Sequence, residues 1–428
     1  MSDSHTITRL RLPLAFCIIL IHLNMGVSGT QIGWGSLSTL DVWRIFACVS
    51  INELAAIAVP LFFLISGFLF FYHAEWSAAT WLAKMRRRVR SLLVPYVLFC
   101  LLAVVSLIIN NVQDGHTLSQ ALHAHLADGK WLHNFWDIHT TGHNTNLLGI
   151  TKPISYPVVI PLWFIRDLMV IVLMTPLIHW AIRRLRLGWI AIMLALSLTG
   201  VWIPLVGFSP TSCLYFSIGA WFSISGKSMA DGLQHWRSPL LMAALPLLAL
   251  DILADGTAAD RYVHFIFLLM AVPATYALAA PKQLVPQGSK FQVPSSKFKV
   301  PSFNFLLPTG ASDSPSKIEG VDAEPARQTG AYDEFSNFKS QISNTQSVSS
   351  LSFFIFAFHT LPIPLLGCRP VEWAKQLLWT NSSNGILCIV QFVGTAFLTA
   401  MVCVLVWGLL YWLCPGLLGL LTGRLSRR

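Results

Sequence analysis

The stretch Arg11-Leu-Pro-Leu-Ala-Phe-Cys-Ile-Ile-Leu-Ile-His22 sets one arginine and one histidine inside an otherwise apolar run. A helix advances about 100° per residue, so this spacing returns to nearly the same face. Arg11 and His22 are therefore predicted to share one stripe of a helix, about 16 Å apart along its axis. Ionisable groups in a bilayer are costly and usually face a bundle interior or an aqueous cavity. For this stretch alone, a structural interpretation stays open, with Arg11 as an anchor and His22 as a hydrogen-bonded core residue.

The composition indicates a polytopic helical membrane protein. Hydrophobic residues make up 54% of the 428 positions and charged residues 11%, whereas soluble domains carry about 25% charged residues. The mean hydropathy is +0.62. The net charge of +10 is concentrated in short segments between apolar runs, as the positive-inside rule requires, so no nucleic-acid partner is expected. The 8 cysteines lie mostly in or beside apolar runs, which argues against a disulfide framework.

Ten apolar runs predict an all-α membrane bundle of about ten transmembrane helices. They lie near residues 11–27, 52–73, 91–110, 158–180, 188–203, 210–225, 238–253, 262–280, 351–367 and 385–414. Basic residues cluster after the second and fourth runs, between the sixth and seventh, and at the end of the chain. All of these clusters fall on one side if both termini are cytoplasmic. The sequence therefore predicts a multi-pass protein of the inner (plasma) membrane, with its N- and C-termini inside.

A segment of different composition interrupts the apolar runs at residues 284–348. It is rich in Gly, Pro, Ser, Lys and Gln, and it repeats Lys-Phe-Gln-Val-Pro-Ser as Lys-Phe-Lys-Val-Pro-Ser. Such a segment buries too little apolar surface to offset its ordering entropy. The predicted organisation is a membrane domain at 1–283, a disordered cytoplasmic insertion at 284–350, and the last two helices at 351–428.

The longest loop of the opposite side, near residues 111–157, carries six histidines among tryptophans and asparagines. Their spacing matches no zinc pattern and no cysteine lies among them, so no metal site is predicted. A solvated cap, or a loop that contacts a sugar-like acceptor, fits this composition better.

Polar residues inside the other runs are few and are candidates for a functional site. Glu53 opens the second run, which continues through Ser66-Gly67, and Trp163, Arg166 and Asp167 lie in the fourth. Adjacent helical residues point about 100° apart, so Arg166 and Asp167 are expected to pair with other helices rather than with each other. His359 lies in the ninth run, beside Thr360 and Pro362, where a histidine is also typical of the cap at a helix break. So many ionisable groups at membrane depth favour function over packing.

Five segments together resemble signatures of the acyltransferase 3 family, in the family's order. They are Arg11-x10-His22, the Phe-Leu-Ile-Ser-Gly of residues 60–71, Arg86-Arg-Arg-Val-Arg-Ser-Leu-Leu-Val-Pro-Tyr96, Leu162-Trp-Phe-Ile-Arg-Asp-Leu168 and Phe356-Ala-Phe-His359. The resemblance implies a ten-helix core that moves an acyl group, often acetyl, from cytoplasmic acyl-CoA to a hydroxyl of a surface polysaccharide or glycolipid. It also implies that Arg11 and His22 are the functional pair of the first helix. No permanently bound cofactor is expected, and transfer is completed in the membrane core or by a separate extracytoplasmic protein.

The residue chemistry suits this activity. An imidazole titrates near neutrality, so His22 could act as the base for a hydroxyl or as an acyl relay. Arg11 could hold a CoA phosphate or an oxyanion. The basic residues Arg86, Arg87 and Arg90 are candidates for donor binding, although the positive-inside rule alone explains their position equally well. The candidates for substrate binding are Glu53, Ser66, Trp163, Arg166, Asp167 and His359. The alternative is a secondary transporter or flippase for a glycolipid or small anion, since buried Arg, His and Asp would serve it equally well.

Overall fold

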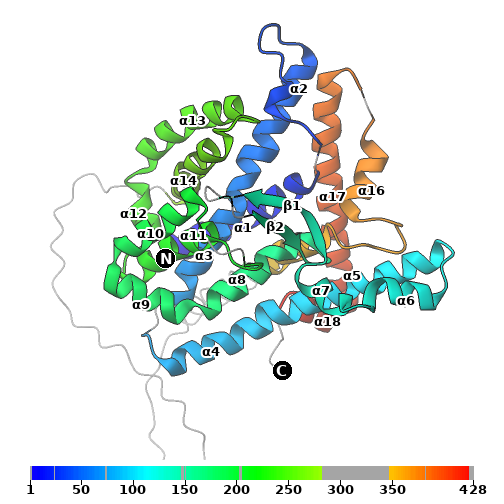
Figure 1. The fold of residues 1–428 in the computed structure, drawn as a ribbon, viewed down its shortest axis with the longest axis horizontal. Helices are drawn as coiled ribbons and strands as arrows, with labels where there is room; N and C mark the ends of the chain where they lie inside the picture. Colours follow the sequence, from blue (N-terminus) through cyan, green and yellow to red (C-terminus); the bar gives the residue numbers. More distant parts are fainter. Residues whose placement is uncertain are drawn as a thin grey trace, which may run out of the picture. The chain divides into compact units, whose positions relative to one another are not determined.

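The computed structural model describes residues 2–23, 25–72, 75–145, 149, 151–201, 205–281, 347–380 and 382–423. The chain divides into two compact units, Met1–Pro281 with Thr345–Arg428, and Lys282–Asn344. The second unit contains nearly all of the predicted insertion and lies outside the described residues. The first unit is helical apart from one β-hairpin (Figure 1).

The first half of this unit contains one long helix, a series of broken helices and the hairpin. Its elements are α1 (Ser2–Leu23), η1 (Gly29–Gln31), α2 (Thr39–Ala47), η2 (Cys48–Leu54), η3 (Ala55–Ile57), α3 (Ala58–Phe71), α4 (Ala78–Arg88), η4 (Val89–Leu93), α5 (Val94–Gln113), α6 (Leu118–Leu126), α7 (Lys130–Trp136), β1 (His139–Thr145) and β2 (Thr151–Tyr156). The strands pair antiparallel, with an irregularity between Thr140 and Gly142.

The described residues of the second half form helices joined by loops, with one isolated β-bridge between Ile363 and Cys368. Its elements are η5 (Ile160–Leu162), α8 (Trp163–Leu173), α9 (Thr175–Leu185), α10 (Leu187–Thr199), α11 (Pro210–Ile224), α12 (Met229–Gln234), α13 (Arg237–Ala254), α14 (Asp260–Ala279), a helix Ser347–Phe358, α16 (Pro370–Leu378), α17 (Gly385–Leu413) and α18 (Pro415–Leu421). All eight cysteines of the chain are free thiols.

Each of the ten apolar runs coincides with a helix, but the count of ten crossings is not confirmed. In the described part of the chain, six helices are long and apolar enough to cross a membrane. They are Asp3–Leu23, Thr39–Phe71, Ala78–Gln113, Arg237–Ala254, Asp260–Ala279 and Gly385–Leu413. Helix α10 and the helix Ser347–Phe358 are apolar but shorter. The protein is therefore a multi-pass helical membrane protein.

The run at 158–180 is a broken helix rather than a straight one. Residues Ile160–Leu173 and Thr175–Leu185 together would make a seventh crossing, but they meet at an angle of 61°. Pro176 follows the break, and a proline cannot donate to the carbonyl four residues earlier, that of Val172. The Thr175 hydroxyl donates to that carbonyl instead, at 2.7 Å, and accepts a hydrogen bond from Trp81 Nε1 at 3.1 Å. The break is thus stabilised from α4.

The centre of the bundle is the contact between α3 and α11, which lie side by side in Figure 1. A Cβ at Gly67 would lie 1.9 Å from the Phe216 carbonyl oxygen, and one at Gly219 would lie 1.9 Å from the Leu64 carbonyl oxygen. Both glycines are therefore needed for the two backbones to approach this closely. The Ser66-Gly67 pair of the sequence thus has a packing role at Gly67.

Candidate active site

Helix α1 carries both residues of the first apolar stretch. It continues from Ser2 to Leu23 with Pro13 inside it. Arg11 and His22 are both half-buried. Arg11 has no hydrogen-bonding or ionic partner among the described residues. The N–H groups of a half-buried guanidinium without a protein partner can bind an anionic ligand, so this position suits one.

His22 meets a second histidine from the far end of the chain. The ring centroids of His22 and His359 are 5.1 Å apart, with their planes at 52°. His359 is completely buried and follows the helix Ser347–Phe358. Its Nδ1 lies 2.8 Å from the Ile355 carbonyl oxygen. Because a carbonyl only accepts, this contact assigns the proton to Nδ1 and leaves a lone pair on Nε2.

Two polar atoms beside this histidine pair lack protein partners. His359 Nε2 and Thr360 Oγ1 are buried and have no hydrogen-bond partner among the described residues. Native proteins rarely bury such atoms without satisfying them, so a ligand or water is expected here. The groups that meet here are the His22 ring, the lone pair of His359 Nε2 and the Thr360 hydroxyl. Such groups can accept a proton or an acyl group.

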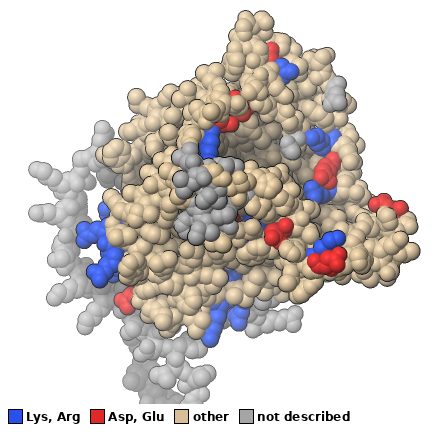
Figure 2. All heavy atoms as spheres, in the orientation of Figure 1, with Lys and Arg blue, Asp and Glu red and all other residues tan. Residues whose placement is uncertain are grey.

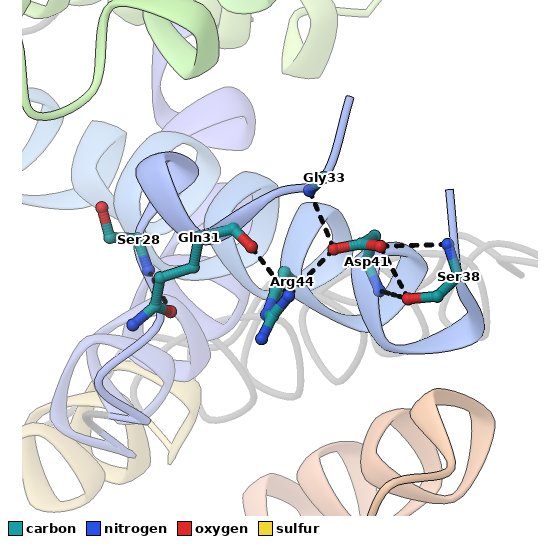
Figure 3. A network of polar contacts seen from close by, with 6 residues as sticks. All are labelled: Ser28, Gln31, Gly33, Ser38, Asp41 and Arg44. Atoms are coloured by element: carbon teal, nitrogen blue, oxygen red, sulfur yellow. Dashed lines mark hydrogen bonds and ion pairs between the residues drawn. The ribbon is translucent and has the colours of Figure 1, made fainter. Parts of the chain in front are cut away.

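The segment that follows His22 is held by a network of polar contacts (Figure 3). The Asp41 carboxylate accepts from the backbone N–H groups of Gly33 and Ser38, each at 3.0 Å, and from Arg44 Nη1 at 2.9 Å. Arg44 also donates to the Gln31 carbonyl oxygen at 2.7 Å. Sequence reasoning missed this network, although Ser38-x-x-Asp41 is a helix-capping pattern that could have revealed it. The network fixes the loop through which α1 is joined to α2.

Arg166 and Asp167 are buried together at the start of α8, with 4% and 5% of their surface exposed. Arg166 Nε donates to Asp167 Oδ1 at 2.9 Å. The prediction that they would not pair with each other is therefore wrong. The rotation of about 100° per helical residue fixes only the direction in which each side chain leaves the backbone. The long Arg166 side chain can bend back, so that its guanidinium reaches the nearest buried carboxylate, that of Asp167. Arg166 also donates to the carbonyl oxygens of Trp136 and Ser155, which ties α8 to α7 and β2.

A cavity of about 260 Å³ opens beside this ion pair. Trp163, Arg166 and Asp167 line it together with Tyr156 and residues 205–209. The structure thus brings three of the candidate substrate-binding residues to one cavity. Aromatic rings beside a few fixed polar groups are typical of small-ligand sites.

Glu53 belongs to a second buried cluster that sequence reasoning did not assemble. His264 Nδ1 lies 2.9 Å from Asp251 Oδ2 and 3.5 Å from Glu53 Oε2. Glu53 lies in η2, Asp251 in α13 and His264 in α14. Both partners were visible as ionisable residues inside predicted spans. One nitrogen and two carboxylate oxygens within 4.8 Å of one another could also hold a metal ion, although the sequence analysis predicted none.

Replacing Asp251 with asparagine is expected to destabilise the protein by about 3 kcal/mol, because breaking a buried ion pair leaves the other group unsatisfied. Glu53→Gln is the matched control. It should cost less, since Glu53 Oε2 lies 3.5 Å from His264 Nδ1, too far for a good hydrogen bond, whereas Asp251 Oδ2 lies at 2.9 Å. Thermal unfolding of the detergent-solubilised proteins measures the difference. Equal unfolding temperatures for the two variants would contradict the assignment of the ion pair to Asp251 and His264.

The remaining candidates lie outside these clusters. Ser66 is half-buried on α3. Arg86 and Arg87 are exposed at the end of α4, and Arg90 is exposed in η4. Figure 2 shows Lys and Arg at the lower and left margins, over α4 and over α9–α10, with few Asp or Glu beside them, whereas those in the upper and right parts lie next to Asp or Glu. A role for these residues in donor binding stays a prediction.

Replacing Arg11 with lysine distinguishes two possible roles of Arg11, a topological anchor and a ligand-binding group. Lysine keeps the positive charge but loses the planar fork that can grip a phosphate or carboxylate through two bonds. We expect acyl transfer by Arg11→Lys to fall well below half of the wild-type rate at equal protein level. An initial-rate assay on purified protein measures this, and a nearly unchanged rate would make Arg11 a topological anchor only.

Comparison with known proteins shows the family of the chain. The family model described as an acyltransferase domain, that of the acyltransferase 3 family, matches residues 5–283. The matched range contains Arg11, His22 and Glu53, whereas His359 lies beyond it. No curated protein and no solved structure matches the chain. Because the match covers more than half of the chain, the protein belongs to the acyltransferase 3 family and is a multi-pass membrane acyltransferase.

Proposed function

We propose that this protein transfers an acyl group, specifically acetyl, from cytoplasmic acyl-CoA to a hydroxyl of a surface polysaccharide or glycolipid. The observation that carries the proposal is the meeting of His22 and His359, with ring centroids 5.1 Å apart and a buried Nε2 that no described residue satisfies. Family membership supplies the reaction class. The histidine pair supplies the base or relay that the reaction needs.

In the proposed mechanism, His22 takes the proton of the acceptor hydroxyl as the oxygen attacks the thioester carbonyl carbon. The tetrahedral oxyanion then collapses, the C–S bond breaks, and the CoA thiolate takes the proton from His22. In the alternative order, His22 attacks the thioester carbonyl first, the C–S bond breaks, and the CoA thiolate leaves with the proton of the imidazole. The acceptor oxygen then attacks the acyl-imidazole, the C–N bond breaks, and the freed ring nitrogen takes the hydroxyl proton. Arg11 steadies the oxyanion or holds a CoA phosphate in either order. A separate extracytoplasmic protein could carry the product onward.

The cavity beside Arg166 and Asp167 is the proposed acceptor site. A sugar presents apolar ring faces and hydroxyl groups, and Trp163, Tyr156 and the Asp167 carboxylate in this cavity complement them. The buried ion pair of Arg166 and Asp167 would keep the shape of this cavity fixed, because Arg166 also donates hydrogen bonds to two backbone carbonyl oxygens.

We propose that the α4–η4 segment is cytoplasmic and the α5–α6 loop extracytoplasmic, in the inner membrane, because the basic residues gather over α4 and α9–α10. In a cysteine-free background, His116→Cys is expected to react with an impermeant maleimide in intact cells. Arg86→Cys, at a position that is also exposed, should react only after permeabilisation. Labelling of the Arg86 position in intact cells would reverse the orientation.

The function is tested with purified protein in vesicles and acetyl-CoA labelled in its acetyl group. An acyltransferase labels a glycan or glycolipid acceptor, and without an acceptor it slowly releases acetate. The second candidate, a transporter or flippase, is favoured by the buried group of Glu53, Asp251 and His264, whose two acids and one base could relay protons. A transporter would leave the thioester intact. Movement of glycolipid across the vesicle membrane without labelling would support it.

A further inference from the structure

A cleft on the face that carries α4 and α9 combines aromatic rings with an arginine. Its volume is about 460 Å³. It is lined by Phe71, Glu75, Trp76, His179, Arg183 and Ser223, among others. These residues come from the ends of α3, α9 and α11 and from the segment before α4. None of them belongs to the histidine pair or to the cavity beside Arg166.

Three rings in this cleft form a stacking platform. The rings of Trp76 and His179 are 4.5 Å apart with their planes at 16°. Phe71 lies nearly parallel to His179, at 6.0 Å and 20°. Parallel rings at an open cleft offer a flat face to another planar ring system, such as a purine base.

Polar groups around the platform match the rest of a nucleotide. Arg183 lies one helical turn from His179 on α9, so both side chains point to the same face. Arg183 also lines an adjoining cavity of about 580 Å³, together with Arg186 and Trp221. A guanidinium is suited to grip a phosphate through two bonds. Ser223 Oγ is buried and has no hydrogen-bond partner among the described residues, and the Glu75 carboxylate can accept from a ribose hydroxyl.

Further positive charge lies one ring away from the platform, outside the lining of the cleft. Lys84 Nζ and Arg88 Cζ lie 5.2 and 6.0 Å from the centre of the Phe70 ring, and Phe70 precedes Phe71 of the cleft. Phe71 and Trp76 also pack in the hydrophobic core, but here the stacked rings lie at a cleft together with Arg183 and a Ser223 hydroxyl that has no partner among the described residues. Their combination fits a purine nucleotide that carries several phosphates.

We propose that this cleft binds the adenosine 3′-phosphate 5′-diphosphate end of the acyl-CoA donor. The proposal rests on acyl-CoA being the donor, as proposed above. Adenine stacks on the outer face of the Trp76–His179 pair, and a phosphate contacts Arg183. The flexible pantetheine arm then carries the thioester toward the histidine pair. The cleft thereby selects donors that carry the nucleotide over shorter thioesters.

The test is binding of adenosine 3′,5′-bisphosphate and initial rates with acetyl-CoA and acetyl-pantetheine, using the full chain in detergent. We expect Arg183→Gln and His179→Ala to weaken nucleotide binding and to raise KM for acetyl-CoA, each roughly tenfold. Their rates with acetyl-pantetheine should stay unchanged. Arg184→Gln and Trp180→Ala are the matched controls, because both residues are exposed neighbours on α9 that do not line the cleft. They should stay within about twofold of wild type.

The outcomes separate this proposal from the proposed function. Acetyl-CoA use by the wild type, with unchanged KM in both cleft variants, would overturn the cleft and leave the acyltransferase proposal standing. No binding or use of acetyl-CoA by the wild type would overturn the donor itself. Equal binding of ATP and adenosine 3′,5′-bisphosphate, both lost in Arg183→Gln without a change in KM for acetyl-CoA, would make the cleft a nucleotide site unrelated to the donor.

Discussion

Replacing His22 with alanine is expected to lower acyl transfer by roughly 10²–10⁴-fold, the usual contribution of a general base. The acceptor hydroxyl is a poor nucleophile unless a base removes its proton, and an acyl relay would be lost in the same substitution. Insertion into the membrane should not suffer, because alanine is less costly in hydrocarbon than a polar ring. The measurement is the initial rate of acetyl transfer at equal amounts of purified protein.

The matched control for His22 is His123→Ala. His123 is an exposed histidine on α6, so its removal tests the loss of an imidazole without touching the histidine pair. It should leave the rate unchanged. Full activity of His22→Ala at normal protein level would end the proposed mechanism and make the transporter or flippase hypothesis the better one.

Helix positions could be predicted from the sequence, but crossings could not. An apolar run predicts a helix because a helix satisfies the hydrogen bonds of its own backbone. Each of the ten runs contains a helix. Whether a helix spans the bilayer depends on its length and on breaks within it. Among the described residues of the run at 188–203, the helix is α10, which has 13 residues, and the run at 158–180 bends by 61°. Pro176 was visible in the sequence, but the compensating Thr175–Val172 hydrogen bond was not.

The site could be predicted only where it depends on one helix. Arg11 and His22 share α1, so helical geometry alone related them. The meeting of His22 with His359, or of Glu53 with Asp251 and His264, joins segments hundreds of residues apart. Only the packing of the helices decides such pairs. The same limit explains the error at Arg166 and Asp167, since their pairing follows from burial rather than from spacing.

We expect the removal of His359 to slow acyl transfer more than its sequence context, beside Thr360 and Pro362, indicates. A histidine that only caps a helix break should give a mild effect on removal. Here the ring is fully buried next to His22, and its Nε2 has no described partner. We therefore expect His359→Ala to lower the rate of acyl transfer at least tenfold, because it removes a lone pair from beside the proposed base.

His359→Asn separates the two roles of this ring. The asparagine amide can still donate to the Ile355 carbonyl, as Nδ1 does now, but it places nothing at the position of Nε2. A cap alone would survive this change, so near-wild-type activity of His359→Asn would return His359 to a structural role. If the two histidines act as one unit, the double variant with His22→Ala should be scarcely slower than His22→Ala alone, because groups that act together are not additive. Independent effects that multiply would instead mean that His359 serves a separate step.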